Sequence, residues 1–234
     1  MEKKRAIDEM LRVWELEDNV VVDPILALLH EQVIEHERRL IERGENVVWV
    51  TDLLRCSQKR IFEEKLGLVQ MPTFEMLHGT IVHEGLEMLC FVKFGWAKEV
   101  EFEKEVEDRD LYEQTELGEK LVHEAQEGRV WKVHGRVDMA DGKRIYEIKT
   151  LSVIPSAEVS EHYRRQCEFL NWLADADECV LIEISHTGYR KTIIREKATE
   201  EDVLRAIIEF KAPRWTWECR YCQYSRWCQY KVAG

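Results

Sequence analysis

Two alternating runs joined by Asp141-Gly142 constrain the fold of this chain most strongly. The runs are WKVHGRVDMA (131–140) and KRIYEIKT (143–150), and apolar side chains recur along both with a spacing of about two. An Asp-Gly pair between such runs is a strong signal for a two-residue hairpin turn, usually of type I′. That turn predicts two antiparallel strands, with Asp138 opposite Ile145.

The predicted hairpin gathers three charged side chains on one face. Residues that are opposed across two strands share a face, and so do residues two apart along one strand. With Ala140 opposite Lys143, the three side chains of Asp138, Glu147 and Lys149 lie together. Asp138 and Glu147 become diagonal neighbours, about 7–8 Å apart between backbones and within joint reach of one ion. A bulged turn would reverse the parity and separate them.

Two carboxylates beside a lysine suit the hydrolysis of a phosphodiester. Mg²⁺ and Mn²⁺ take oxygen ligands from Asp and Glu. Such an ion polarises the phosphate and lowers the pKa of an attacking water, and a lysine can orient that water or stabilise the developing charge. The alternative is a structural charge cluster or salt bridge, because Glu-x-Lys is common on strand faces. The hairpin alone leaves both interpretations open.

Composition limits the class of protein and its partners. The 234 residues are 45% hydrophobic and 34% charged, with a net charge of −12, which suits one folded domain with an appendage. The negative charge argues against non-specific binding of polyanions, but frequent Arg and Lys from Arg190 to Lys231 leave room for a basic face. The N-terminus has no signal-peptide core and no stretch is long enough to span a membrane. We therefore expect a cytoplasmic protein without membrane contact, whose seven cysteines are thiols or metal ligands.

Helical and strand patterns are mixed along the chain. Helices are predicted over 23–43, 51–67, 76–95, 161–176 and 199–212. Further strands are predicted over 46–51 and in a hairpin, 179–186 with 189–196, around Thr187-Gly188. The acidic stretch 99–127 shows no clear pattern. This mixture predicts an α+β or mixed α/β fold around a partly antiparallel sheet.

Cysteines in the C-terminal tail predict a metal centre. Cys219, Cys222 and Cys228 form C-x2-C-x5-C, and the closely spaced first pair is typical of ligands. Cys56, in the polar stretch LLRCSQKR, is the best fourth ligand and would tie the two ends of the chain together. Four thiolates suit zinc or an iron–sulfur cluster, and spacing does not separate the two. The remaining cysteines lie in apolar or helical settings, which predicts small buried side chains: Cys90, Cys167 and Cys179.

In their order along the chain, these motifs resemble a known family. A lone cysteine, then His, Asp, Glu-x-Lys and Gln motifs, then C-x2-C-x5-C is the order in the RecB-type branch of the P-D-(D/E)-x-K nucleases, and within it in the CRISPR-associated Cas-four proteins. The resemblance spans about Val50 to Gln229 and rests on the combination of motifs. It implies a restriction-endonuclease-like nuclease core with a cysteine-bound iron–sulfur subdomain that joins N- and C-terminal segments.

The resemblance also implies roles for single residues. His83, in HGTIVHEGLE, Asp138, Glu147 and the carbonyl of Ile148 match the family's ligands for Mn²⁺ or Mg²⁺. Lys149 matches its catalytic lysine. The cluster ligands, for 4Fe-4S more often than 2Fe-2S, match Cys56, Cys219, Cys222 and Cys228.

Gln166, in YRRQCEFLNWL, resembles the start of the family's Q-x-x-x-Y motif, which helps place the site and the DNA. The chain departs from that motif at Leu170, where the family often has tyrosine. Tyr163, one helical turn before Gln166, can partly substitute for it. The departure affects the placement of DNA and leaves the predicted metal site unchanged.

Several other residues have both a functional and a plainer interpretation. His78 is a rival to His83. Glu84 and Glu87 are predicted to be solvated or supporting charges, with contact to the metal as the lesser alternative. Aromatic residues of the tail can stack on bases, but most are expected to pack around the cluster: Trp215, Trp217, Tyr221, Tyr224, Trp227 and Tyr230. Basic residues can follow a phosphate backbone or form a solvated face: Arg190, Lys191, Arg195, Arg214, Arg220 and Arg226.

The predicted function is that of a metal-dependent deoxyribonuclease. The resemblance implies an exonuclease that digests single-stranded DNA from a 5′ end and trims spacer precursors in CRISPR adaptation beside the integrase proteins, as a monomer or an oligomer. The alternatives are a recombination or viral end-processing nuclease outside CRISPR, and a non-catalytic, cluster- or zinc-bearing DNA-binding scaffold. The expected divisions are an N-terminal helical region, a helix carrying Cys56, a nuclease core and a cysteine segment: 1–45, 46–75, 76–212 and 213–234.

Overall fold

The computed structural model describes residues 31, 33, 34, 44, 46–66, 73–107, 129–155 and 158–232. Of the helix predicted over 23–43, it describes Glu31, Val33 and Ile34, which are helical. The rest of that prediction lies outside the described residues, and so does most of the acidic stretch predicted to lack a pattern.

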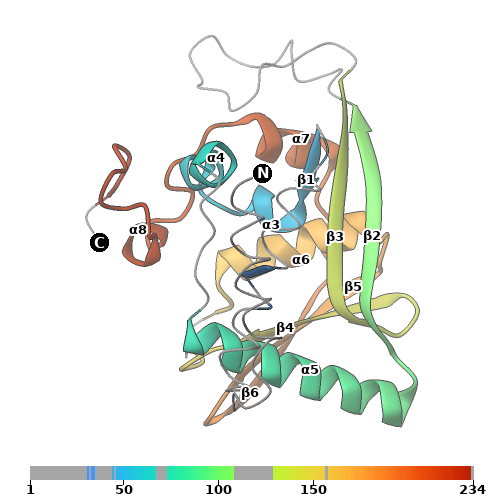
Figure 1. Cartoon of the computed structure of the whole chain (residues 1–234). Coiled ribbons are helices and arrows are strands. Elements are labelled where there is room, and N and C mark those ends of the chain that lie inside the picture. The colour runs from blue at the N-terminus through green and yellow to red at the C-terminus, as the bar shows by residue number, and fades with distance from the viewer. Residues whose placement is uncertain are drawn as a thin grey trace, which may run out of the picture.

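A six-stranded mixed sheet forms the centre of the fold (Figure 1). The strands are β1 (Val47–Trp49), β2 (Ala97–Glu107), β3 (Val130–Ala140), β4 (Arg144–Thr150), β5 (Glu178–Ser185) and β6 (Gly188–Ile194). Their order is β1-β3-β4-β5-β6, with β2 paired to β3. The β1–β3 and β4–β5 pairs are parallel and the other pairs are antiparallel. The predicted mixed α/β fold is confirmed.

Helices cover the two faces of this sheet. The larger core lies under α3 (Val50–Leu53), α6 (Glu161–Leu173) and α7 (Glu200–Ile208). The smaller core consists of Met139, Tyr146, Ile148 and Val180, and α5 (Phe74–Phe94) packs there through Leu86 and Cys90. The helix predicted over 199–212 begins with a capping box, because Thr199 and Asp202 each accept the other's backbone N–H. That helix ends at Ile208, earlier than predicted.

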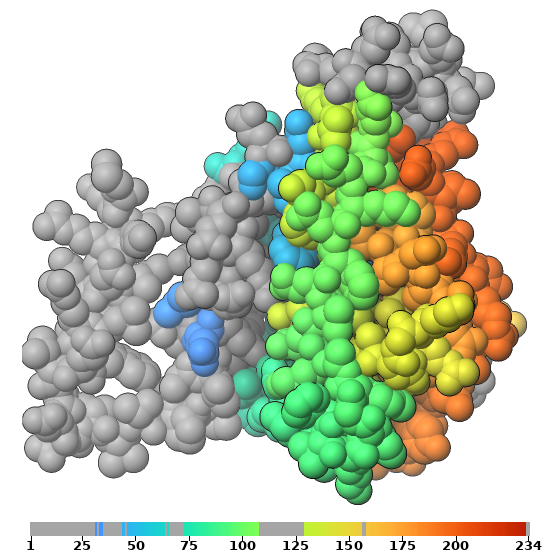
Figure 2. All heavy atoms as spheres, turned by 90° about the vertical axis from the view of Figure 1, so that its right-hand side faces the viewer, coloured from blue at the N-terminus to red at the C-terminus, as the bar shows by residue number. Residues whose placement is uncertain are grey.

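Strand β2 is an element that the sequence analysis missed. Its sequence AKEVEFEKEVE alternates charged residues with Val100, Phe102 and Val106, whose side chains are the less exposed ones. The abundance of glutamate hid this period-two pattern. The strand runs along one side of the molecule, green in Figure 2. Its charged outer residues suit a sheet edge that must not pair with another chain.

The predicted turn at Asp141-Gly142 is wrong by one residue. The backbone N–H of Asp141 donates to the carbonyl of Arg144, so Gly142, at φ 106°, and Lys143 form the turn. Ala140 therefore pairs with Ile145 instead of Lys143. Because the turn moves by one residue, each residue of β3 faces a β4 residue two positions further along than predicted. A shift of two positions leaves every side chain on the sheet face that was predicted for it.

Strand β3 is irregular at Asp138. Val137 belongs to the larger core and Met139 to the smaller core, although regular alternation would point both to one face. On the neighbouring strand Glu99, between the residues paired with Val137 and Met139, has a φ of 49°. This is a left-handed conformation that non-glycine residues seldom adopt. The regular alternation of side chains, from which the position of Asp138 was predicted, therefore fails at that residue.

The single helix predicted over 51–67 is divided in two. α3 ends at Leu53 and α4 (Ser57–Leu66) begins four residues later, with Cys56 directly before it. The backbone N–H groups at this break donate hydrogen bonds to residues that are distant in sequence. The N–H of Cys56 donates to the Glu218 carboxylate, and the N–H of Ser57 donates to the carbonyl of Lys211. Tertiary hydrogen bonds thus replace the helical bonds that would have joined the two helices.

The C-terminal segment that contains α8 (Glu218–Tyr221) packs beside α4 (Figure 1). Glu218 accepts three backbone N–H groups, from Cys56, Arg214 and Trp215, at 2.9 Å each. The indole N–H of Trp215 donates to the carbonyl of Leu54 at 2.8 Å. Buried Tyr224 packs against Phe62 with ring centroids 5.3 Å apart. These contacts join parts of the chain that are about 160 residues apart in sequence.

Replacing Glu218 by alanine is expected to destabilise this junction. Three backbone donors lose a charged acceptor, which we expect to lower the free energy of unfolding by about 2–3 kcal/mol and the melting temperature by about 5–10 °C. Thermal unfolding followed by circular dichroism measures the change. Glu158→Ala, at an exposed residue, is the control and should melt like the wild type. Equal melting of the Glu218 variant and the control would show that the junction contributes nothing to stability.

Among the described residues, none of the helices combines the length and the apolar character needed to cross a membrane.

Candidate functional site

Helix α5 carries the first two residues of a carboxylate site. Thr73 caps its start by accepting the N–H of Met76, and Gly95, at φ 71°, ends it in a left-handed conformation. His83 and Glu87 are four residues apart and therefore lie on one side of the helix. His83 is partly buried and Glu87 is only 3% exposed. His78, the rival histidine, is exposed.

Asp138 lies next to this side of α5. Its Oδ2 lies 3.6 Å from Nδ1 of His83. One ligand atom from each of His83, Glu87 and Asp138 can be chosen so that all three lie within 4.8 Å of one another. A histidine nitrogen and two carboxylate oxygens at this separation form a possible metal-binding site. The irregularity of β3 at Asp138 is what lets this strand residue reach α5.

Glu147 and Lys149 lie beside Asp138, on β4. The backbone N–H of Ile148, between them, donates to Oδ2 of Asp138 at 2.5 Å. The N–H and C=O of one strand residue point to the same strand edge. The carbonyl of Ile148 is therefore directed to the edge where Asp138 lies. Nζ of Lys149 donates to Oε1 of Glu147 at 2.5 Å.

Helix α6 completes the surroundings of this pair. Nε2 of Gln166 donates to the same Oε1 of Glu147 at 2.6 Å, and Nζ of Lys149 lies 5.7 Å from the ring centroid of Tyr163. Leu170 is buried in the larger core. The structure thus brings Gln166 and Tyr163 to the carboxylate site and leaves Leu170 in the core.

Burial and charge shift the acidities of this site in opposite directions. Burial raises the pKa of Glu87 to about 7, and the nearby Asp138 and Glu84 add to the shift. Burial also raises the pKa of Glu147 to about 7, against the opposing charge of Lys149. At Asp138, burial is outweighed by the hydrogen bond with His83 and the charge of Lys149, so its pKa is lowered. For Lys149, ion pairing with Glu147 and Asp138 outweighs burial and raises the pKa.

Two buried carboxylate oxygens of the site have no hydrogen-bond partner among the described residues. They are Oε2 of Glu87 and Oε2 of Glu147. A buried polar atom is costly unless a hydrogen bond or an ion satisfies it. Both atoms belong to the cluster that interacts with Asp138 and His83. The donor set therefore fits a hard divalent cation.

Glu87 is the main residue that the sequence analysis misjudged. It was predicted to be a solvated or supporting charge, but it is buried and shares the site with His83 and Asp138. The available signal was its spacing of four from His83, which places both on one side of a helix. Glu84 is exposed, as predicted.

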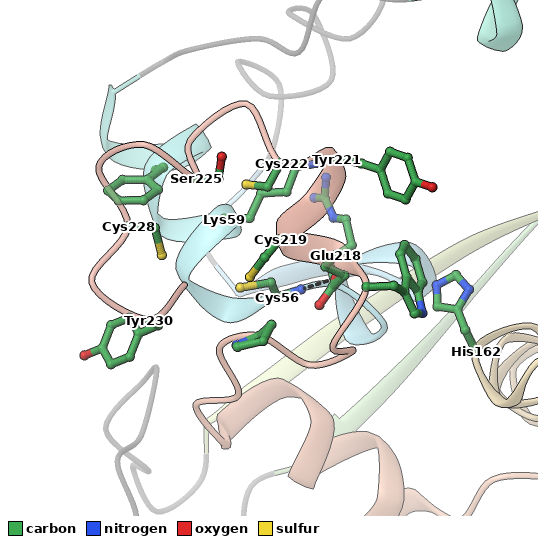
Figure 3. Close-up of a pocket in the computed structure, with 14 residues that line it drawn as sticks. Cys56, Lys59, His162, Glu218, Cys219, Tyr221, Cys222, Ser225, Cys228 and Tyr230 are labelled. Atoms are coloured by element: carbon green, nitrogen blue, oxygen red, sulfur yellow. Dashed lines mark hydrogen bonds between the residues drawn. The ribbon is translucent and has the colours of Figure 1, made fainter. Parts of the chain in front are cut away.

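The four cysteines named from sequence line a second site. Cys56, Cys219, Cys222 and Cys228 surround one cavity of about 280 Å³, shown in Figure 3. Cys56 comes from the turn before α4 and the others from the C-terminal segment. Arg55 and Lys59 also line the cavity and suit an anionic thiolate centre. Burial raises the pKa of the Cys56 thiol and of the Cys222 thiol.

The remaining cysteines pack in or against the two cores, and two of the arginines form hydrogen bonds with residues of the fold. Cys167 and Cys179 are buried in the larger core, and Cys90 packs against the smaller one. Arg190 forms an ion pair with buried Glu183. Arg214 donates to the carbonyls of Arg55 and Ala206. Both arginines therefore have structural partners within the fold.

Comparison with known proteins gives a consistent result. No protein-family model matches the chain. The chain is 29% identical over 218 residues to the CRISPR-associated exonuclease Cas4 of Saccharolobus solfataricus (strain ATCC 35092 / DSM 1617 / JCM 11322 / P2), covering 88% of this chain and 98% of that protein. The crystal structure of SSO0001 superposes with a TM-score of 0.73 at 26% identity, over 92% of this chain and 100% of that one.

The fold and the relatives define the class first: the chain is an exonuclease with a mixed α/β fold. Within that class, it is similar to the CRISPR-associated exonuclease Cas4 in sequence, and to SSO0001 in fold.

Proposed function

We propose that this chain is a Mn²⁺- or Mg²⁺-dependent exonuclease that digests single-stranded DNA from a 5′ end and carries an iron–sulfur cluster. The observation that carries the proposal is the convergence of His83, Glu87 and Asp138 within 4.8 Å, directly beside the Glu147–Lys149 pair. A site with this composition suits phosphodiester hydrolysis, and DNA is the substrate expected of an exonuclease in this family.

The proposed metal ligands are His83, Asp138, Glu147 and the carbonyl of Ile148, to which the geometry adds Glu87. The buried, unsatisfied Oε2 atoms of Glu87 and Glu147 support this set. Asp138 is held in place by the N–H of Ile148. Gln166 fixes the other oxygen of Glu147. The side chains that would bind the ion are thus positioned by their neighbours before it arrives.

A divalent ion bound there would polarise the phosphate and lower the pKa of the attacking water. The chain's own contribution lies in Lys149. Its raised pKa keeps the side chain cationic, and its contact with Glu147 holds Nζ at the edge of the site. We propose that Lys149 orients the attacking water and stabilises negative charge on the phosphate oxygens. Tyr163 packs beside this lysine and takes the place of the family tyrosine that Leu170 replaces.

The second proposed centre is a 4Fe-4S cluster held by Cys56, Cys219, Cys222 and Cys228. The meeting of all four cysteines at one cavity supports a thiolate-bound metal group, and the resemblance of the motif order favours an iron–sulfur cluster over a single zinc ion. When bound, such a cluster would cross-link the α4 region to the C-terminal segment. We assign 46–75 and 213–234 to this cluster-binding unit, 76–212 to the nuclease core and 1–45 to an N-terminal region.

Mn²⁺ binding is expected to weaken as the pH falls below about 7. Glu87 and Glu147 have pKa values raised to about 7, so below that pH each carboxyl increasingly carries a proton that the metal must displace. The dissociation constant should rise by up to about tenfold per pH unit for each such carboxyl, and level off above about pH 8. Calorimetric titration between pH 6 and 8 measures this dependence.

In Glu87→Gln, the slope of log Kd for Mn²⁺ against pH should become less steep by about one, because binding no longer displaces a proton from this carboxyl. Glu75→Gln is the matched control, since Glu75 lies on the same helix, is exposed and is not among the charges that shift the pKa of Glu87. A slope equal to that of the wild type in Glu87→Gln would remove Glu87 from the ligand set.

In the cell, we propose that the enzyme trims spacer precursors during CRISPR adaptation, beside the integrase proteins. The CRISPR-associated relative supports this role. A chain that binds integrase proteins should co-purify with them when the genes are expressed together. Failure to co-purify would favour a nuclease role outside CRISPR.

The experiment that tests the proposed function uses anaerobically purified protein and two labelled oligonucleotides. With Mn²⁺, an oligonucleotide labelled at its 5′ end should release the label as short products, while a 3′-labelled one should shorten progressively. Double-stranded DNA should be digested more slowly. Iron and zinc analysis of the same sample should find about four iron atoms per chain. Absence of any cleavage with Mn²⁺ or Mg²⁺ would contradict the nuclease, and one zinc per chain would contradict the cluster.

A further inference from the structure

The aromatic residues of the C-terminal segment divide into two groups. Tyr224 is buried and Trp215 is partly buried, and both pack or hydrogen-bond inside the fold. Trp217, Tyr221 and Trp227 are 48%, 68% and 73% exposed. Exposed aromatic side chains of this size need an explanation when they gather in one short segment. Trp217 and Tyr221 also line the cysteine cavity, but about half or more of each side chain remains exposed there.

A series of ring contacts connects Trp217 to the carboxylate site. Nζ of Lys149 lies 5.7 Å from the Tyr163 ring centroid. The ring of Tyr163 is 5.4 Å from that of His162, which is in turn 5.5 Å from that of Trp217 at an interplanar angle of 89°. Exposed Trp217 is thus reached from Lys149 through three successive contacts.

Tyr221 extends this path on the outside of the molecule. In Figure 3 its ring points away from the four cysteines, on the side where His162 lies. A group bound among the thiols would therefore leave the ring accessible. The guanidinium of Arg220, an exposed residue, lies 5.5 Å from the Tyr221 ring centroid. Stacking surfaces next to a cation are the combination that single-stranded nucleic acids bind.

We propose that Trp217 and Tyr221 form a platform on which bases of single-stranded DNA stack as the strand leads to Lys149. This inference rests on the proposed function, because it supplies the binding surface for the same substrate. Single-stranded DNA is the occupant since its bases are free to stack on aromatic rings, whereas those of a duplex are paired and stacked on each other. Arg220 contacts the phosphate backbone beside the platform.

The test measures binding of a fluorescent 20-nucleotide oligo-dT by anisotropy, without divalent ions, so that no cleavage is required. Trp217→Ala and Tyr221→Ala should each weaken binding by about 5- to 150-fold, the range for loss of one base–aromatic stack. Trp217→Phe keeps a ring and should retain most of the affinity. Trp227→Ala is the matched control, because this tryptophan is equally exposed in the same segment but lies outside the platform. It should bind within about twofold of the wild type.

Iron content and the melting temperature of each variant show whether the segment is still folded. Wild-type affinity in folded Trp217→Ala and Tyr221→Ala overturns the platform, and so does an equal loss in Trp227→Ala. A wild-type protein that cleaves no DNA, but whose oligo-dT binding depends on Trp217, supports the platform while the proposed nuclease fails. A protein that cleaves DNA, but binds it equally well without Trp217 and Tyr221, keeps the nuclease and overturns the platform.

Discussion

Replacing Lys149 by alanine is expected to lower the rate of single-stranded DNA cleavage by about 10²–10³-fold. The variant loses the cation that contacts Glu147 at 2.5 Å and lies next to the proposed metal ligands. It also loses the charge that opposes protonation of Glu147, so the pKa of this glutamate should rise further. The assay is therefore run at pH 8 or above, where the carboxylates are more fully ionised and the loss reflects the missing ammonium group.

Two readouts separate a catalytic loss from a folding loss in Lys149→Ala. The iron content and the absorption of the cluster should match those of the wild type, because Lys149 lies outside the cysteine cavity. Lys143→Ala, at a lysine whose side chain is 84% exposed in the β3–β4 turn, should cleave DNA at the wild-type rate. Full activity in folded Lys149→Ala would remove the lysine from the mechanism.

Replacing Cys222 by serine is expected to remove the proposed iron–sulfur cluster. A serine hydroxyl is a poor substitute for a thiolate at iron, so iron should fall from about four atoms per chain to less than about one. Because the binding energy of a structural metal centre contributes to folding, the melting temperature should drop by about 10 °C or more. Cys56→Ser should have the same effect, since Cys56 is the proposed ligand from the other part of the chain.

Cys90→Ser is the control for the cysteine variants. Cys90 is a partly buried thiol that packs against the smaller core, away from the cavity. Its variant should keep its iron and its absorption band near 400 nm. If Cys222→Ser retained all of its iron, the assignment of the fourfold thiolate site would be wrong, whatever the nuclease activity of that variant.

The elements that were predicted correctly depend on neighbours in sequence. Helix α5 begins after Thr73 and ends at Gly95, and α7 begins at the Thr199–Asp202 capping box. The second hairpin is present, although Ser185 pairs with Gly188, so its two-residue turn is His186-Thr187 and not the predicted Thr187-Gly188. Capping, turn formation and period-two alternation each involve groups only a few residues apart. They are therefore readable from a single chain.

Two of the errors arose where distant segments compete with local preference. The chain over 51–67 has a helical pattern throughout, but Glu218 and Lys211 capture the N–H groups of Cys56 and Ser57 and divide the helix. Glu87 has the residue type of a solvated charge, and only packing of α5 on the sheet makes it buried. The partners that decide both outcomes are far away in sequence.

The mixed α/β class, the presence of two hairpins and the Cas4-like order of motifs follow from patterns among nearby residues. How those motifs meet depends on packing between distant segments. Asp138 reaches both α5 and β4 because β3 breaks its alternation there, opposite Glu99 at φ 49°. The Cys56 turn lies beside the C-terminal cysteines because Glu218 and Trp215 bond to the backbone around it. Local signals specify the elements, whereas burial and long-range hydrogen bonds specify which side chains share a site.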